Sequence, residues 1–219
     1  MKKVESKIYN EDYFEKGAVK GISGYMNFSW MPELTIRMAH FLIKNLPIES
    51  HEVVLDFGCA KGFLVKSLRL LNVEAYGVDV SKYAIEQVDA SSRNHCKQIS
   101  GVTDITLFAR EYDLMIAKDV FEHISEEELK YLLNCAKTKV KRMFVVVPLA
   151  GDDHSGRYII PEYDNDITHI IAKTELWWNE LFQNNGWQIK NFSYDFPGCK
   201  ENWTSSYSKG NAFYIIEHN

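Results

Sequence analysis

Short apolar runs alternate with longer amphipathic segments along most of this chain, and this alternation restricts the possible folds more than any other feature. Four of the runs lie at residues 53–57, 75–80, 112–117 and 143–148. Runs of this kind are typical of strands that are buried on both faces of a parallel sheet. Since strands that alternate with helices form βαβ units, we expect a mostly parallel sheet with helices on both faces.

Helical periodicity predicts the elements between and around these strands. Residues 125–140 begin with Ser125 and Glu128 at the spacing of a capping box. Their apolar positions form one helical face, made of Leu129, Leu132, Leu133, Ala136 and Val140. Helices are also expected at residues 32–46 and 174–185.

Two further strand-like runs, 187–195 and 212–217, have no helix between them. We therefore expect them to pair as an antiparallel hairpin at one end of the sheet. The fold class predicted is α/β, with a doubly wound sheet.

Length and charge limit the kind of protein that this can be. The chain has 219 residues, 46% of them hydrophobic, and a net charge of −5. This composition excludes general disorder, and the length favours a single domain over residues 1–219. The mild acidity argues against a protein that wraps nucleic acid, because neutralising phosphates needs a basic surface. No apolar run approaches the ~20 residues needed to cross a bilayer, so no membrane partner is expected.

The cysteines lie far apart, at positions 59, 96, 135 and 199. This spacing excludes a C-x-x-C zinc or redox motif. Since the N-terminus also lacks the apolar core of an export signal, we expect reduced thiols and a cytoplasmic location.

The clearest functional signal is the segment VVLDFGCAKGFLV at residues 53–65. A strand runs into a turn that starts at Gly58 and ends at Gly62, and a helix begins at about Phe63. Glycines let the backbone turn sharply and approach a ligand closely. The free N–H groups at the helix N-terminus then favour an anionic group such as a carboxylate or phosphate.

Two acidic residues narrow the choice of ligand. Asp79 lies 21 residues after Gly58, at the end of the second strand, where a carboxylate can accept hydrogen bonds from both hydroxyls of a ribose. Asp56, inside the first strand, would repel a pyrophosphate but suits a cationic amino group. The spacing G-x-x-x-G also differs from the G-x-G-x-x-G of dinucleotide sites. These features predict a nucleoside that carries an amino acid, namely S-adenosylmethionine.

The motifs resemble those of the class I (Rossmann-like) S-adenosylmethionine-dependent methyltransferases, especially the bacterial and phage branch that includes sugar and small-molecule methyltransferases. The glycine-rich motif of the family matches residues 54–62, with Ala60 where glycine is commoner, and its acidic second-strand motif matches Asp79. Its fourth-strand motif matches Asp113-Leu114 and then DVFEHI at 119–124. Since the segments 9–17 and 168–187 are similar as well, the resemblance covers nearly the whole chain.

The resemblance implies a seven-stranded sheet that ends in an antiparallel hairpin, and S-adenosyl-L-homocysteine as the product. It also implies that Asp56 orients the amino group of the cofactor, that Asp79 holds the ribose and that Val80 packs on the adenine. The full set of implied cofactor residues is Asp56, Gly58, Cys59, Ala60, Gly62, Asp79, Val80, Val102, Lys118 and Asp119. Cys59 is expected to be a small packing residue and not a nucleophile.

One position departs from the family pattern. Many relatives have an acidic residue at the end of the third strand, where it accepts a hydrogen bond from the adenine amino group. Here that place falls at Ser100 or Gly101, and Asp104 follows a few residues later. The adenine contact is therefore expected from the backbone amide of Val102 or from Asp104 itself.

Methylation of a hydroxyl or amine also requires that the acceptor lose a proton. His123 is the first candidate, because it follows a strand end where open α/β sheets bind ligands. A structural histidine bonded to backbone or to Glu122 is the alternative. The second candidate is His169, and His154 lies in the same irregular region.

A metal site is not predicted. Four residues could in principle contribute ligands, namely Asp152, Asp153, His154 and Asp166. They lack the helical i, i+4 spacing that would support such a site.

Two segments outside the regular pattern are expected near the site. Residues 1–31 carry Tyr9, Tyr13, Phe14, Tyr25, Phe28 and Trp30. They are predicted to form an arm packed on the domain, a cap over the cofactor and acceptor, or both. Residues 149–173 fit neither periodicity, and such long inserts are commonly functional, so we place them near the acceptor site.

The sequence therefore predicts a methyltransferase that acts on oxygen or nitrogen of a small polar metabolite or a sugar or glycan precursor. One alternative is a protein or nucleic-acid acceptor, although the D-P-P-Y type of signature used on base amines is absent. Two others are a nicotinamide-dependent oxidoreductase and a catalytically silent partner subunit. The oligomeric state is left open.

Overall fold

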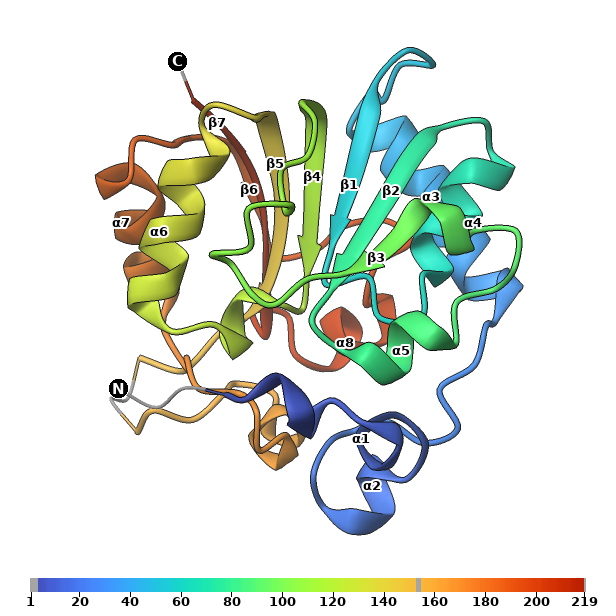
Figure 1. The fold of residues 1–219 in the computed structure, drawn as a ribbon. Coiled ribbons are helices and arrows are strands. Elements are labelled where there is room, and N and C mark those ends of the chain that lie inside the picture. The colour runs from blue at the N-terminus through green and yellow to red at the C-terminus, as the bar shows by residue number, and fades with distance from the viewer. Residues whose placement is uncertain (1–3, 153–154, 219) are drawn as a thin grey trace.

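The strands expected from the sequence form one sheet in the computed structural model, which describes residues 4–152 and 155–218 (Figure 1). Its seven strands are hydrogen-bonded in the order β3-β2-β1-β4-β5-β7-β6. Their bounds are β1 Val53–Phe57, β2 Glu74–Asp79, β3 Cys96–Gln98, β4 Tyr112–Lys118, β5 Val140–Pro148, β6 Gln188–Ser193 and β7 Asn211–Glu217. Only β7 runs antiparallel to its neighbours, β5 and β6, so the predicted sheet and its terminal hairpin are confirmed.

Helices cover both faces of the sheet. The longer ones are α3 (Pro32–Asn45), α4 (Phe63–Leu70), α6 (Glu126–Ala136) and α7 (Glu175–Asn184). The shorter ones are α1 (Glu11–Glu15), α2 (Gly17–Lys20), α5 (Lys82–Glu86) and α8 (Glu201–Ser206). Helices α3 and α4 lie on one side, and α6 and α7 lie on the other (Figure 1).

Neighbouring residues of a strand pack into different cores, as expected when both faces of a parallel sheet are buried. In β1, Val54 packs with α3 and α4, whereas Leu55 packs with α6 and α7. Strand β4 shows the same alternation with Leu114 and Met115. The continuous apolar runs of the sequence therefore supply two cores at once.

Two local predictions differ from the structure, and one strand was not predicted from periodicity. Val140 begins β5, where it pairs with Tyr112, and does not extend the face of α6. Strand β3 has only Cys96 fully buried, which is why periodicity alone does not reveal it. The loop between the last two strands contains α8.

The carboxyl ends of the parallel strands meet two irregular parts of the chain. The N-terminal segment and the segment that follows residue 155 lie beneath this edge of the sheet (Figure 1). They touch each other, since Ile167 N donates to Ile22 O. Within the part of the chain that the structure describes, no helix has the length and apolar character required to cross a membrane.

Candidate active site

A cavity of about 400 Å³ lies at the carboxyl ends of β1, β2 and β4. Its lining from the sheet side includes Phe57, Gly58, Ala60, Val78, Asp79, Val80, Asp119 and Val120. Residues from the N-terminal segment close it, among them Val4, Tyr9, Tyr13, Phe14 and Tyr25. The predicted aromatic arm therefore contributes directly to the wall of this cavity.

The turn after β1 has the backbone conformation that its glycines allow. Gly58 has φ +81°, and a Cβ there would lie 2.4 Å from Val120 Cγ2. Gly62 has φ +69°, and its Cβ would lie 2.8 Å from Cys96 Sγ. Any other residue at either position would be strained and would also clash. Ala60, between them, also has a positive φ, of 47°.

Asp79 is held in place by the backbone of this turn and of the next one. Its Oδ2 accepts from Ala60 N at 2.7 Å, and its Oδ1 accepts from Ser81 N at 2.7 Å. Burial raises the pKa of Asp79, although the backbone donors partly offset this. Each carboxylate oxygen has a second lone pair, so the oriented carboxylate can still accept two hydroxyl groups of a ribose.

Asp56 is only 5% exposed. Burial raises the pKa of Asp56 to about 7, the Lys118 ammonium partly offsets this, and the Asp79 carboxylate adds to it. A buried carboxylate of this kind is stabilised by a cationic ligand group. The amino group predicted from the sequence would meet that requirement.

The predicted cofactor residues occupy two kinds of position. Those that line the cavity are Gly58, Ala60, Asp79, Val80, Val102 and Asp119. Those that do not line it are Asp56, Cys59, Gly62 and Lys118. Cys59 is buried, and its Sγ packs so closely on Gly77 that a Cβ added there would lie only 2.7 Å away. This close contact agrees with a packing role for Cys59.

The segment after β3 contributes Ile99, Ser100, Gly101, Val102 and Thr103 to the lining. Asp104 is not part of it. Its carboxylate accepts from Ser100 N and Thr106 N, each at 2.8 Å, and these bonds hold the pKa of Asp104 well below its usual range. Of the two expected adenine contacts, the structure leaves the backbone of Val102 as the better placed.

Three charged side chains converge beside the cavity, at the end of β4. Lys118 Nζ donates to Asp119 Oδ2 at 2.6 Å, and Lys200 Nζ forms an ion pair with Asp119 Oδ1. Burial would raise the pKa of Asp119, but the two ammonium groups hold it well below its usual range. Lys200 could not be predicted from the sequence, because no motif connects the loop before α8 with the end of β4.

The two predicted catalytic histidines lie together, although 46 positions separate them. The ring centroids of His123 and His169 are 4.6 Å apart. Burial lowers the pKa of His123 to about 4, and the neighbouring His169 adds to this shift. Burial also lowers the pKa of His169, so both imidazoles are neutral at pH 7.

Hydrogen bonds determine which nitrogen of His123 carries the proton. Thr168 Oγ1 donates its only hydrogen to Asp166 Oδ1 at 2.5 Å, so it must accept from His123 Nδ1 at 2.8 Å. Tyr13 Oη donates to the other oxygen of Asp166 at 2.8 Å. The proton of His123 therefore lies on Nδ1, and Nε2 keeps a lone pair. Thr168 was not assigned a place in the site from the sequence, and Asp166 was weighed there only as a metal ligand.

A second cavity, of about 310 Å³, adjoins the first at the histidine pair, since His123 lines the first cavity and His169 lines the second. The second cavity is lined by Gly156, Tyr158, Asp164, Asp166, His169, Ile170, Ala172 and Lys173. All of these residues belong to the segment 149–173 that the sequence places near the acceptor. Of the metal ligands weighed from the sequence, Asp153 and His154 lie outside the described residues.

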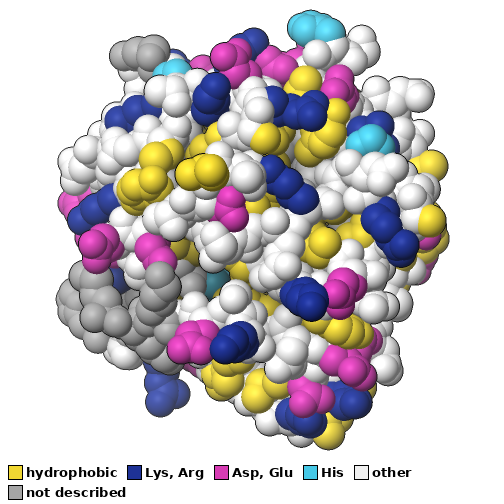
Figure 2. All heavy atoms as spheres, viewed as in Figure 1, with side chains coloured by type: hydrophobic (Ala, Val, Ile, Leu, Met, Phe, Trp, Pro, Cys, Tyr) yellow, Lys and Arg dark blue, Asp and Glu magenta, His cyan; other side chains and the backbone are white. Residues whose placement is uncertain are grey.

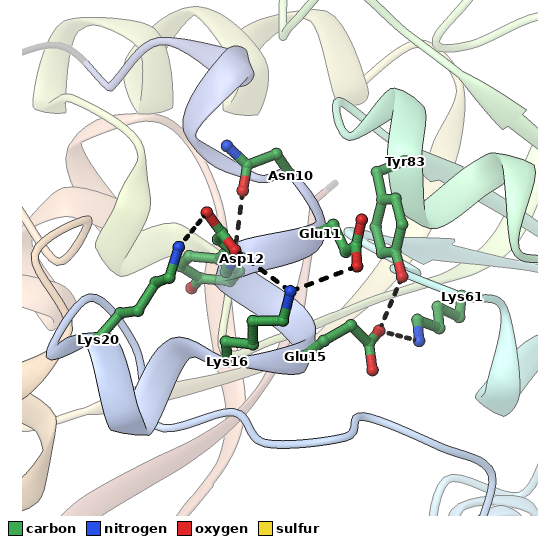
Figure 3. Close-up of polar contacts among 9 residues, drawn as sticks. Asn10, Glu11, Asp12, Glu15, Lys16, Lys20, Lys61 and Tyr83 are labelled. Atoms are coloured by element: carbon green, nitrogen blue, oxygen red, sulfur yellow. Dashed lines mark hydrogen bonds and ion pairs between the residues drawn. The ribbon is translucent and has the colours of Figure 1, made fainter.

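The N-terminal arm is tied to the glycine turn by a partly buried ion pair (Figure 3). Lys61 Nζ lies 2.5 Å from Glu15 Oε1 and also donates to Phe28 O at 2.6 Å. Tyr83 Oη, from α5, donates to the same oxygen of Glu15 at 3.0 Å. These contacts join α1 to the loop that lines the first cavity.

Comparison with known proteins agrees with this architecture. Residues 30–191 match a family model described as a methyltransferase domain. Among curated proteins, no sequence matches this chain.

Several solved structures share the fold. The pyocyanin biosynthetic protein PhzM has a TM-score of 0.57 and 13% identity over 83% of this chain and 55% of its own. CalO1, a methyltransferase in calicheamicin biosynthesis solved in its SAH-bound form, has a TM-score of 0.56 and 11% identity over 85% of this chain and 54% of its own. The CcbJ methyltransferase from Streptomyces caelestis has a TM-score of 0.62 and 12% identity over 87% of this chain and 91% of its own. The chain thus spans about half the length of PhzM and CalO1.

Proposed function

This chain belongs to the methyltransferase family and is an S-adenosylmethionine-dependent enzyme, and on that premise we propose that it methylates oxygen or nitrogen of a small polar molecule such as a sugar or glycan precursor. The family match removes the nicotinamide-dependent oxidoreductase from consideration. It does not select the acceptor, because one fold serves many acceptors.

The first cavity suits the cofactor in size and chemistry. With a volume of about 400 Å³, it can enclose a nucleoside that carries an amino acid. We assign the ribose to Asp79, the amino group to Asp56, and the adenine to the surface formed by Val80 and Val102. When bound, S-adenosylmethionine supplies an electrophilic methyl group on its sulfonium. The residues of this chain align that group and exclude water around it.

The second cavity is the observation that carries the proposed acceptor class. Its walls offer carboxylates from Asp164 and Asp166, the imidazole of His169 and the ammonium of Lys173. Its volume of about 310 Å³ suits a molecule the size of a monosaccharide or similar metabolite. A polar acceptor with several hydroxyl or amino groups would satisfy these donors and acceptors together.

Deprotonation of the acceptor is assigned to His123 and His169. Both rings are neutral, and His123 directs its proton-bearing nitrogen toward Thr168. The pair lies where the two cavities adjoin, which is where the acceptor must meet the methyl group. His123 ranks first because it lines the cofactor cavity itself.

The alternative acceptors have less support. Acidic and basic side chains are mixed over the face shown in Figure 2, and no extended basic patch gathers there. A nucleic-acid acceptor would also have to approach the carboxylates of Asp164 and Asp166. A protein acceptor is the second candidate. A catalytically silent subunit finds no support in a site that combines a ribose carboxylate with a neutral histidine pair.

The free thiols support the predicted compartment. All four cysteines are unpaired, as they would be in the reducing cytoplasm. We therefore retain the cytoplasm as the proposed location. On the separate ground of the sequence motifs, we also retain the bacterial and phage branch of the family.

Calorimetric titration with S-adenosylhomocysteine, S-adenosylmethionine and NAD tests the cofactor assignment. We expect binding of both sulfur nucleosides, no binding of NAD, and loss of binding in Asp79→Ala. Transfer of a radiolabelled methyl group to a panel of sugars, sugar nucleotides, peptides and RNA then tests the acceptor class. Labelling of peptides or RNA alone would contradict the proposal.

A second comparison tests the histidine assignment. His123→Ala should lower turnover by ~10²–10⁴-fold, the range for loss of a proton-transfer group, and leave S-adenosylhomocysteine binding within a few-fold. Unchanged turnover would contradict it.

A further inference from the structure

The histidine pair has a third member, Glu122. One possible ligand atom from each of Glu122, His123 and His169 lies within 4.8 Å of the other two. Glu122 and His123 belong to the short 3₁₀ turn Phe121–His123 after β4, and His169 belongs to the segment after β5. Ile170 N and Ile171 N both donate to Glu122 O, at 2.9 and 3.1 Å, so the backbone holds these two elements together.

Both imidazoles are oriented so that Nε2 is the nitrogen available to bind. His123 Nδ1 donates to Thr168 Oγ1, as shown above. His169 Nδ1 lies 2.7 Å from Tyr163 O, which can only accept, so this nitrogen carries the proton. Histidines that bind metals almost always donate their other ring N–H to a carbonyl, carboxylate or similar acceptor. The outer contacts of such a site are therefore already formed on both rings.

The carboxylate of Glu122 has an unsatisfied oxygen. Glu122 is 1% exposed, and its Oε2 has no hydrogen-bond partner. A buried carboxylate oxygen without a partner is costly, and a cation is the most effective compensation. The neighbouring Asp166 and Asp119 carboxylates act on His123 in the direction that favours a cation, whereas the Lys200 ammonium acts on His169 in the opposite direction.

We propose that Glu122 Oε2, His123 Nε2 and His169 Nε2 bind a divalent cation where the two cavities adjoin. Two imidazoles and one carboxylate favour a borderline transition ion such as Zn²⁺, Mn²⁺ or Co²⁺ over Mg²⁺ or Ca²⁺, which prefer oxygen ligands. Three protein ligands leave a coordination position open for an exogenous oxygen, as in catalytic sites.

The proposal rests on the proposed function and specifies the role of the histidines in deprotonation. With Nε2 of both rings bound to the cation, the rings act as ligands and do not accept the proton themselves. An acceptor hydroxyl that binds the cation loses its proton to water or buffer, because the cation lowers the pKa of bound oxygen. The resulting alkoxide forms an O–CH₃ bond while the CH₃–S bond of the sulfonium breaks. The electron pair of that bond stays on the sulfur of S-adenosylhomocysteine, so no oxidant or reductant is required.

Cation binding can be measured without acceptor or methyl transfer. The full chain, treated with chelator and then desalted, is titrated with Mn²⁺ and followed by electron paramagnetic resonance. A parallel titration with Co²⁺ is followed by visible absorption. We expect one cation per chain, and binding weakened at least about tenfold in Glu122→Gln and His169→Gln. The matched control is His40→Gln, an exposed histidine of α3, which should bind like the unchanged protein.

Thr168→Val keeps all three ligands and removes the hydroxyl that accepts from His123 Nδ1 and donates to Asp166 Oδ1. It should weaken cation binding ~10- to 100-fold, the usual effect of losing such an outer contact. S-adenosylhomocysteine titration of each variant shows whether it is folded and whether the cofactor site is intact.

The outcomes separate this inference from the proposed function. Absence of binding at millimolar Mn²⁺ and Co²⁺, or binding that Glu122→Gln and His169→Gln retain, overturns the cation site. If S-adenosylhomocysteine still binds and chelator leaves methylation unchanged, only the cation inference fails. If S-adenosylhomocysteine does not bind to the unchanged protein, the cofactor assignment fails instead.

Discussion

At the scale of single residues, the pKa of Asp56 has a consequence for cofactor affinity. Since this pKa is raised to about 7, the carboxylate of the ligand-free protein is largely protonated at pH 6 and largely ionised at pH 8. Only the ionised form attracts the amino group of the cofactor. We expect S-adenosylhomocysteine to bind more tightly as pH rises from 6 to 8, as measured by calorimetry.

Asp56→Asn should remove most of this pH dependence. It should also weaken binding at pH 8 by ~10- to 100-fold, because a hydrogen bond to a charged group contributes about 1.5–3 kcal/mol. The same raised pKa means that the folded state binds the proton more strongly than the unfolded state. Asp56 therefore lowers stability as pH rises from about 4 to about 7, and the Asn variant should lack this slope in urea unfolding. An affinity that stays constant from pH 6 to 8 in the unchanged protein would contradict the assignment.

Ala60 illustrates a local conflict between side chain and backbone. Its φ of 47° is left-handed, which costs a non-glycine residue about 1–2 kcal/mol. Glycine would remove that strain but lose about 0.5–1 kcal/mol to the greater freedom of the unfolded chain. We expect Ala60→Gly to raise the free energy of unfolding by up to about 1 kcal/mol in urea denaturation. Ala60→Val, whose branched side chain is excluded from this φ, should lower it.

At the scale of elements, the attachment of α1 to the glycine turn should control closure of the cofactor cavity. Glu15→Gln removes the charge that faces Lys61 in a pair whose side chains are 21% and 10% exposed. We expect S-adenosylhomocysteine binding to weaken by ~5- to 30-fold, or about 1–2 kcal/mol, with faster dissociation. Hydrogen exchange of residues 4–25 should rise in parallel.

The same arm offers a matched control. Lys20 pairs with Asp12 at 2.5 Å on the exposed side of α1 (Figure 3). Because exposed pairs contribute little, Lys20→Gln should leave both dissociation and exchange unchanged. Equal effects of the two substitutions would contradict a specific role of the contact between Glu15 and Lys61.

At the scale of the whole molecule, the cofactor cavity joins the ends of three strands to the N-terminal segment, so its ligand should stabilise the fold as one unit. S-adenosylhomocysteine at 100 times its Kd should add about 2.7 kcal/mol to the free energy of unfolding. For a chain of this length that corresponds to a rise of roughly 5–10 °C in Tm. Differential scanning calorimetry should show this rise in the unchanged protein. NAD, or Asp79→Ala at the same ligand concentration, should produce none.

Most of the sheet could be predicted because its information is local. Apolar runs, the capping pair Ser125 and Glu128, and the turn from Gly58 to Gly62 are each specified by residues adjacent in the chain. The exceptions have local causes as well. Val140 satisfies both the helical face and the ladder with Tyr112, and pairing in the sheet prevails. The residues of β3 are too few and too polar for periodicity to indicate a strand.

The sequence by itself therefore determined the order of the elements, the two-faced parallel sheet and the acidic residues at its strand ends, because periodicity and turn chemistry act over a few neighbouring residues. Only the tertiary structure brought His169 and Thr168 to His123, Lys200 to Asp119, and Glu15 to Lys61. The members of these groups are 45 to 81 positions apart. Their meeting depends on how irregular segments pack across the strand ends, which no local pattern encodes.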